Sequence, residues 1–148
     1  MTINSKFSIL ILIVLFARCS SNLQSIKSIS YHSGGGEMGG YTKIEITKDS
    51  INGLFINPNK KIIIKEKTQK TLWDSLTKSV TLNDFKQIKS GKSVVHIDGI
   101  DISVKIETAL ESYILLNGNI DEVQNKKVYH FMEILEHELR NIYRRANH

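Results

Sequence analysis

Residues 128–146 read VYHFMEILEHELRNIYRRA, and this stretch carries the clearest structural pattern in the chain. Apolar side chains recur there every three or four residues with charged side chains between them, as in a helix with one buried face. Asp121 and Gln124 lie where such a helix would start, and the pattern runs to about Arg145. At about 1.5 Å per residue the helix would be roughly 35 Å long, enough to cross a whole sheet. Its predicted apolar face is Val128, Phe131, Met132, Leu135, Leu139, Ile142 and Ala146.

Upstream of this helix, apolar and polar residues alternate in several short stretches, which predicts β-strands. The pattern is clearest at 41–47 (YTKIEIT), where Ile44 and Ile46 share one face. Asn52-Gly53 has the composition of a turn, and residues 93–97 are expected to begin a strand. The other predicted strands are 25–32, 54–56, 60–68, 100–107 and 112–116. The first half of the chain therefore predicts an antiparallel meander, followed later by a hairpin.

Two short helices are expected between the meander and the hairpin. Thr71 with Asp74, and Thr81 with Asp84, each place a hydroxyl three residues before a carboxylate, close to a capping box. The order is thus strands, short helices, a hairpin and a long helix. This order predicts an α+β two-layer sandwich, with an antiparallel sheet covered by the long C-terminal helix and one or two short helices.

Composition limits the class of protein. The 148 residues are 41% hydrophobic and 24% charged, with one proline and one cysteine, as in an ordinary globular chain. The net charge of +5 comes from dispersed lysines rather than from a basic patch with stacking aromatics, so a nucleic-acid partner is not expected. The cysteine count excludes an internal disulfide and a cysteine-ligated zinc. No cofactor and no metal are expected.

The first nineteen residues predict export. Lys6 precedes the apolar run 7–17 (FSILILIVLFA), and the run ends just before Cys19, which is followed by Ser20-Ser21-Asn22. A basic start, an apolar core and a boundary of this kind are typical of a secretory signal. The run would be only about half as long as the hydrocarbon core of a bilayer, which disfavours a stable transmembrane span. We expect a signal peptide at 1–18, a tether at 19–25 and a single domain at 26–146.

A signal that ends on a cysteine resembles the precursors of bacterial lipoproteins, with Leu15-Phe16-Ala17-Arg18-Cys19 in the place of the lipobox. The resemblance implies a diacylglycerol on the Cys19 sulfur, cleavage just before this residue, and a membrane held as partner through the lipid. Arg18 departs from the small residue usual at that position, so ordinary secretion and an uncleaved anchor stay open as alternatives.

The mature part resembles small lipoproteins of Bacteroidota that have no assigned activity. The similarity lies in Ile29-Ser30-Tyr31, the glycine-rich stretch before Tyr41, the helix containing Trp73 and the long final helix. No aspartate follows Cys19, and by analogy with sorting rules this implies an outer-membrane lipoprotein that faces the periplasm or the cell surface.

The stretch 33–41 (SGGGEMGGY) has the most unusual local composition. A phosphate-binding loop would need a helix after it, whereas the residues that follow are strand-like, so the glycines are expected to join two strands. We predict that this loop contacts a partner, with Glu37, Met38 and Tyr41 as its main contacts. The predicted binding loop is Gly34, Gly35, Gly36, Glu37, Met38, Gly39, Gly40 and Tyr41.

Two other groups of residues could carry chemistry. His130, Glu133 and His137 share one helical face and could ligate zinc, but this face lies opposite the apolar stripe and is better interpreted as solvated. His32 and Ser33 with Asp98 or Asp101 would form a hydrolase triad, yet no Gly-x-Ser-x-Gly turn supports this interpretation.

The sequence therefore predicts a non-catalytic, lipid-anchored module of the cell envelope that binds another envelope protein. Two alternatives stay open: an inhibitor or helper of a periplasmic enzyme, and a small periplasmic hydrolase. A binding module should expose an apolar patch beside the glycine loop or at a sheet edge. A hydrolase should instead gather polar side chains in one pocket.

Overall fold

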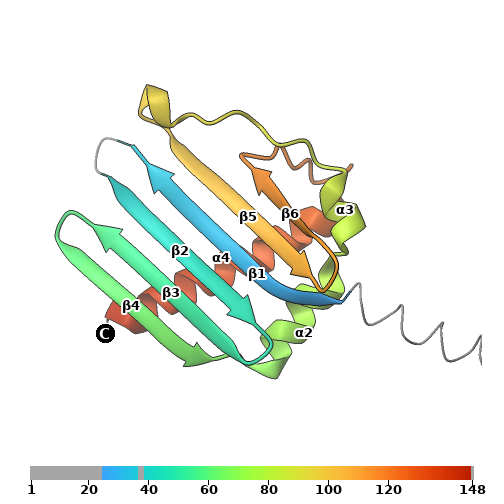
Figure 1. Cartoon of the computed structure of the whole chain (residues 1–148), viewed down its shortest axis with the longest axis horizontal. Coiled ribbons are helices and arrows are strands. Elements are labelled where there is room, and N and C mark those ends of the chain that lie inside the picture. The colour runs from blue at the N-terminus through green and yellow to red at the C-terminus, as the bar shows by residue number, and fades with distance from the viewer. Residues whose placement is uncertain (1–24, 37–38, 148) are drawn as a thin grey trace, which may run out of the picture.

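The computed structural model describes residues 25–36 and 39–147, which form one antiparallel sheet and the helices packed against it (Figure 1). The strands are β1 (Ile26–Gly35), β2 (Gly40–Thr47), β3 (Ser50–Asn57), β4 (Lys60–Lys67), β5 (Ile100–Thr108) and β6 (Ser112–Leu116). The helices are α2 (Lys70–Ser79), α3 (Leu82–Lys86) and α4 (Lys126–Asn147), with the 3₁₀ turn η1 at Val95–Ile97.

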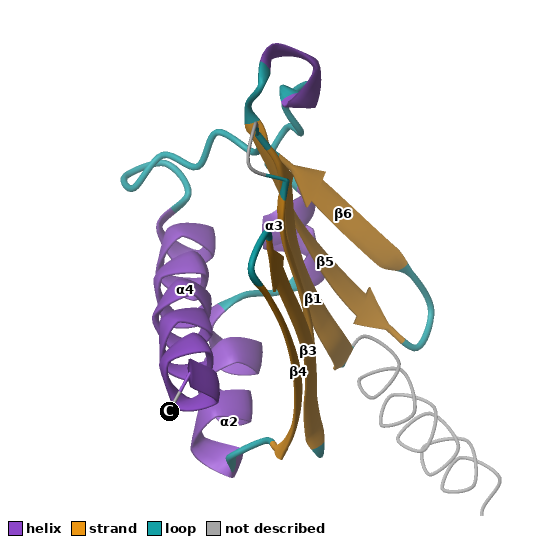
Figure 2. Ribbon diagram, turned by 90° about the vertical axis from the view of Figure 1, so that its left-hand side faces the viewer, coloured by secondary structure: helices purple, strands orange, loops and turns teal. Residues whose placement is uncertain are grey.

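The sheet has the strand order β4-β3-β2-β1-β5-β6, and every pair is antiparallel. β1 lies at its centre, paired with β2 on one side and with β5 on the other. Figure 2 shows α2 and α4 against one face of the sheet, while no described element covers the opposite face. The predicted two-layer α+β arrangement, with a long C-terminal helix over an antiparallel sheet, is confirmed.

The core forms between the covered face of the sheet and the apolar stripe of α4. In register, Ile29 pairs with Ile46 on one side and with Ile106 on the other, and all three side chains are buried. Phe131 of α4 meets Phe85 of α3 edge-on, with ring centroids 5.7 Å apart. The buried residues of α4 are Val128, Phe131, Leu135, Leu139 and Ile142, all from the predicted apolar face.

One of the two predicted capping boxes is confirmed and the other is wrong. The Thr81 hydroxyl accepts from the Asp84 amide at 3.2 Å, and the Asp84 carboxylate accepts from the Thr81 amide at 2.9 Å. α2 instead begins at Lys70, after Gln69, and no side chain caps it. Thr71 is therefore the second residue of the helix, and its hydroxyl does not cap the helix start.

Three boundary predictions are also corrected. Asn52 and Gly53 lie within β3 rather than in a turn: a Cβ on Gly53 would be 3.3 Å from the Ile64 Cβ, so the glycine makes room for its neighbours. Residues 93–97 form a loop and η1 instead of a strand start. α4 begins at Lys126, because Asp121 caps a separate turn by accepting from the Val123 and Gln124 amides.

The predicted signal peptide and Cys19 lie outside the described residues. No helix in the described part of the chain is long and apolar enough to cross a membrane.

Candidate functional site

The glycine hairpin that joins β1 to β2 has a backbone that requires glycine. Gly35 has φ of +119°, and a Cβ there would lie 2.6 Å from the Gly99 carbonyl oxygen and 2.9 Å from Val95 Cγ2. Gly36 and Gly39 also have positive φ, of 76° and 59°, and the Gly39 amide donates to the Gly36 carbonyl at 3.0 Å. Such values strain any other residue, so these glycines set the shape of the hairpin. Glu37 and Met38, two of the three predicted contacts, lie outside the described residues.

The loop before β5 packs against this hairpin and is held there by Asp101. One carboxylate oxygen of Asp101 accepts from the Val94 amide and from the Asn117 side-chain amide, each at 2.8 Å. A hydrogen bond from Ser93, followed by those from Val94 and Asn117, lowers the pKa of the Asp101 carboxyl below its usual value. The Asn117 amide nitrogen also donates to the Lys92 carbonyl at 2.9 Å. Asp101, a residue of β5, therefore holds the loop that contains η1 in its position beside Gly35.

A groove of about 610 Å³ opens at this end of the covered face, where the sheet extends beyond α4. We call it the hairpin groove. Both strands of the glycine hairpin contribute to it, as do β3, the start of β5 and Tyr143 of α4. Its lining residues are Ser33, Gly35, Gly36, Gly40, Tyr41, Thr42, Phe55, Ile56, Asn57, Asp98, Ile100 and Tyr143.

A smaller cavity of about 340 Å³, here called the α4 pocket, adjoins the groove because Thr42, Phe55 and Tyr143 line both. The rings of Phe55 and Tyr143 meet edge-on with centroids 5.2 Å apart. Burial raises the pKa of the Tyr31 phenol in this pocket, a hydrogen bond with Ser33 opposes the shift, and the charge of Glu136 adds to it. The full lining of the α4 pocket is Tyr31, Thr42, Phe55, Leu139, Arg140, Tyr143 and Arg144.

Exposed apolar side chains concentrate at this end of the molecule. Ten large apolar side chains of the described residues are exposed, and three of them belong to residues that line the groove. Ile100, with 56% of its surface exposed, is the most exposed of those that line the groove itself. The three are Ile56, Ile100 and Tyr143, while Val95 and Ile97 are exposed in η1. Exposed apolar side chains therefore lie beside the glycine hairpin, and those of the groove residues come from β3, β5 and α4.

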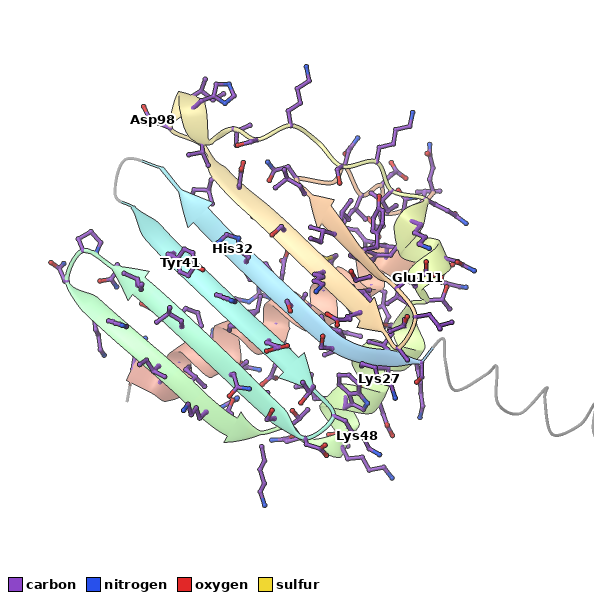
Figure 3. The ribbon with its side chains drawn as sticks, in the orientation of Figure 1. Lys27, His32, Tyr41, Lys48, Asp98 and Glu111 are labelled. Carbon is purple, nitrogen blue, oxygen red and sulfur yellow. The ribbon has the colours of Figure 1, made fainter. Side chains whose placement is uncertain are left out.

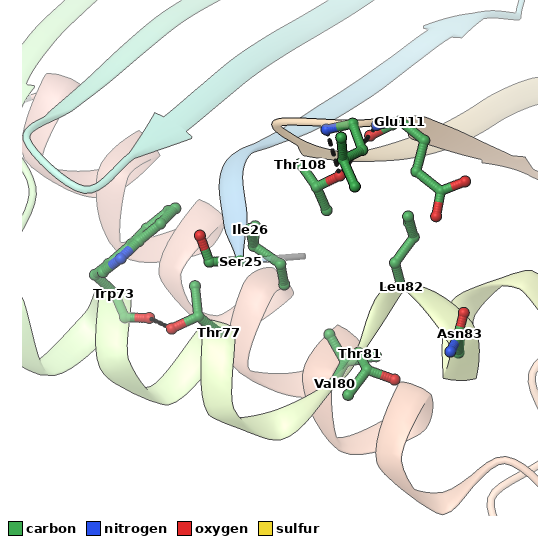
Figure 4. Close-up of a pocket in the computed structure, with 11 residues that line it drawn as sticks. Ser25, Ile26, Trp73, Thr77, Val80, Thr81, Leu82, Asn83, Thr108 and Glu111 are labelled. Atoms are coloured by element: carbon green, nitrogen blue, oxygen red, sulfur yellow. Dashed lines mark hydrogen bonds between the residues drawn. The ribbon is translucent and has the colours of Figure 1, made fainter. Parts of the chain in front are cut away.

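A second cavity of similar size, about 640 Å³, lies at the opposite end of the molecule, where β1 begins (Figure 4). Its polar groups serve local structure. The Thr77 hydroxyl donates to the Trp73 carbonyl at 2.8 Å, and the Thr108 hydroxyl donates to the Glu111 carbonyl at 3.0 Å. This cavity adjoins Ser25, and the residues just before Ser25 are not described, so its lining is incomplete. We therefore place the candidate site at the glycine hairpin.

The constellations considered for catalysis are not assembled. His32 lies on the open face of the sheet, beside Tyr41 with ring centroids 4.8 Å apart (Figure 3), whereas Ser33 lines the groove on the covered face. Neighbouring residues of a strand point to opposite faces, so these two side chains diverge. Asp101 is engaged by Val94 and Asn117.

The histidines of α4 lie on its solvated side. His130 and Glu133 are exposed and 3.6 Å apart, while His137 is exposed and lies 3.3 Å from the Asn141 amide. Among residues 25–36 and 39–147, no group of three or more acidic, histidine or cysteine side chains could hold a metal ion.

No protein-family model and no curated protein sequence matches this chain. The candidate site is therefore assigned from the geometry of this chain alone. Of the described residues in the predicted binding loop, Gly35, Gly36, Gly40 and Tyr41 line the groove, while Gly34 and Gly39 do not. Ile56, Ile100 and Tyr143 are groove residues that the sequence pattern does not predict, because strand alternation and helical spacing show only which face a residue takes.

Proposed function

We propose that this protein is a non-catalytic, lipid-anchored module of the cell envelope that binds another envelope protein through the hairpin groove. One observation carries the proposal: Ile100 and Tyr143 line this groove although 56% and 42% of their surfaces are exposed. Contiguous exposed apolar surface is uncommon on monomeric proteins and usually marks an interaction site. The groove is also concave and mostly preformed, since glycines and the Asp101 contacts fix its walls.

The direction of β1 agrees with anchoring at Cys19. β1 begins at Ile26, next to the proposed tether, and ends at Gly35 in the groove. At about 3.3 Å per residue, its ten residues separate the two ends by roughly 33 Å. Figure 3 shows Lys27 and Lys48 at the tether end and Asp98 at the groove end. A domain held by a lipid at the tether would carry its groove at the end away from the attachment point.

Site-specific photo-cross-linking in cells tests the groove. A photoreactive amino acid replaces Ile100 in the groove or, as the control, Ile63 of β4 on the open face; 56% and 64% of these side chains are exposed. We expect a discrete adduct with an envelope protein from position 100 and none from position 63. Adducts of equal yield at both positions, or adducts at position 63 alone, would contradict a binding site in the groove.

A further inference from the structure

The hairpin groove exposes apolar side chains, and the adjoining α4 pocket is lined by two arginines. We infer that together they receive an extended peptide segment of the partner protein in which an acidic residue stands beside apolar side chains. This inference rests on the proposed function and names the chemistry of the partner that the function leaves open.

The shared floor of the two cavities is apolar and aromatic. Phe55 is largely buried and holds Tyr143 edge-on at 5.2 Å, while Tyr143 keeps 42% of its surface exposed toward the groove. Ile100 lines the same groove and is also exposed. These side chains offer apolar surface that the fold leaves uncovered, and an apolar side chain of a bound peptide would remove that surface from water.

The far side of the α4 pocket is cationic. Arg140 and Arg144 stand one helical turn apart and both line the pocket. Arg140 has one weak, exposed ion pair, with Glu136 at 3.8 Å, and Arg144 forms no ion pair or hydrogen bond within the described part of the chain. Arginine side chains in this arrangement favour a carboxylate.

The neighbouring Arg145 differs from Arg144 because its side chain forms ion pairs within the fold. Arg145 donates to Glu66 at 2.6 Å and to Glu138 at 3.0 Å, so its charge is compensated within the fold. Those contacts raise the pKa of the Arg145 guanidinium, with Glu66 as the largest cause. Of two adjacent arginines, one is thus used for structure and the other is left beside the apolar groove.

The protein's own tether is a poor occupant of this site. With cleavage before Cys19, residues 19–24 precede the described chain, and an extended segment of this length reaches at most about 20 Å. The groove lies roughly 33 Å from the start of β1, the length of the ten-residue strand. A tether of this length therefore does not reach the groove.

Fluorescence anisotropy with three labelled peptides tests the inference on the purified full-length chain in detergent. The probes are Phe-Asp-Ile-Asp-Leu, its amide analogue Phe-Asn-Ile-Asn-Leu, and Phe-Lys-Ile-Lys-Leu. Each exposed charge pair contributes little, so we expect the acidic peptide to bind about fivefold more tightly than the amide peptide. Equal affinities for the three peptides, or no binding of any, would overturn the inference.

Charge reversal at Arg144 supplies the decisive comparison. Arg144→Glu should reverse the preference, so that the lysine peptide binds more tightly than the acidic one. Lys89→Glu makes the same charge change at an exposed residue outside both cavities, and it should leave the preference unchanged. If both variants alter binding equally, the effect is one of net charge and the inference fails.

Tyr143→Ser tests the apolar floor separately, and it should weaken all three peptides while circular dichroism stays the same. Light scattering identifies a second copy as the occupant if the chain is a dimer that Tyr143→Ser converts to a monomer, and that result would also overturn the inference. A cross-link at position 100 without a charge preference among peptides would leave the proposed function standing and remove only this inference.

Discussion

Gly35 shows how strongly a single residue constrains the groove. Its φ of +119° lies in a region that residues with a side chain rarely adopt, and a Cβ would meet the backbone of Gly99 at 2.6 Å. Both the strain and the contact oppose substitution. The hairpin and the loop before β5 can approach this closely only because neither residue has a side chain.

Gly35→Ala should therefore lower the free energy of unfolding by about 2–4 kcal/mol, from backbone strain together with the displaced loop. Gly40→Ala is the matched control, because a Cβ there would have no heavy atom within 4 Å, and its effect should be within about 0.5 kcal/mol. Urea unfolding of both variants measures the difference. Equal losses would show that the hairpin is not held as described.

Asp101 gives the stability a dependence on pH. Hydrogen bonds from Ser93, Val94 and Asn117 lower its pKa in the folded chain, so its ionised form stabilises the fold above the unfolded pKa of about 4. This contribution is lost as the pH falls through the lower, folded pKa. Asp101→Asn should accordingly reduce Tm at pH 7 and reduce it less at pH 3. A Tm difference between the two proteins that is the same at both pH values would contradict the assignment.

At the scale of the element, β5 shows the limit of pattern reasoning. Ile100, Ile102, Val104 and Ile106 alternate as expected and share one face of the sheet. α4 lies over Ile106, which is fully buried, but the strand continues past the helix, so Ile100 stays exposed. Alternation predicts which face of the sheet a side chain lies on. Whether that side chain is buried depends on where a helix from a distant part of the sequence crosses the sheet. The groove results from this mismatch in length.

Two substitutions of the same type in β5 test this interpretation. Ile106→Ala removes a fully buried side chain and should cost about 2–5 kcal/mol. Ile100→Ala removes one that is 56% exposed and should cost about 0.5 kcal/mol, while weakening the binding of the acidic peptide. Thermal unfolding and peptide anisotropy on the two variants separate stability from binding. A large loss of stability for Ile100→Ala would mean that this residue belongs to the core.

The helix starts allow a similar comparison. Thr81→Ala breaks the box with Asp84 and should lower stability by about 1 kcal/mol. Thr71→Ala should have almost no effect, because the predicted box at this position does not form and alanine has a high helix propensity. Chemical denaturation of the pair checks both statements. An equal cost at the two positions would show that the Thr81 contacts are not what stabilises α3.

At the scale of the whole molecule, the class of fold could be predicted because it follows from local patterns. The helical stripe of α4 and the alternation in β2 and β5 each need only a few neighbouring residues. The groove could be predicted only in part. Its glycine hairpin is visible in the composition, but the meeting of Gly35, Phe55, Ile100 and Tyr143 joins residues from four distant segments. Such contacts depend on strand order and on the path of α4, which no local pattern contains.

In this account, a lipid on Cys19 attaches the chain to the membrane at the end where β1 begins, with the groove at the other end. Mass spectrometry of the N-terminal peptide, on chain purified from the membrane fraction, tests this claim most directly. We predict a peptide that begins at Cys19 and carries diacylglycerol on its sulfur. An unmodified chain recovered from the cytosol with Met1 intact would contradict the account.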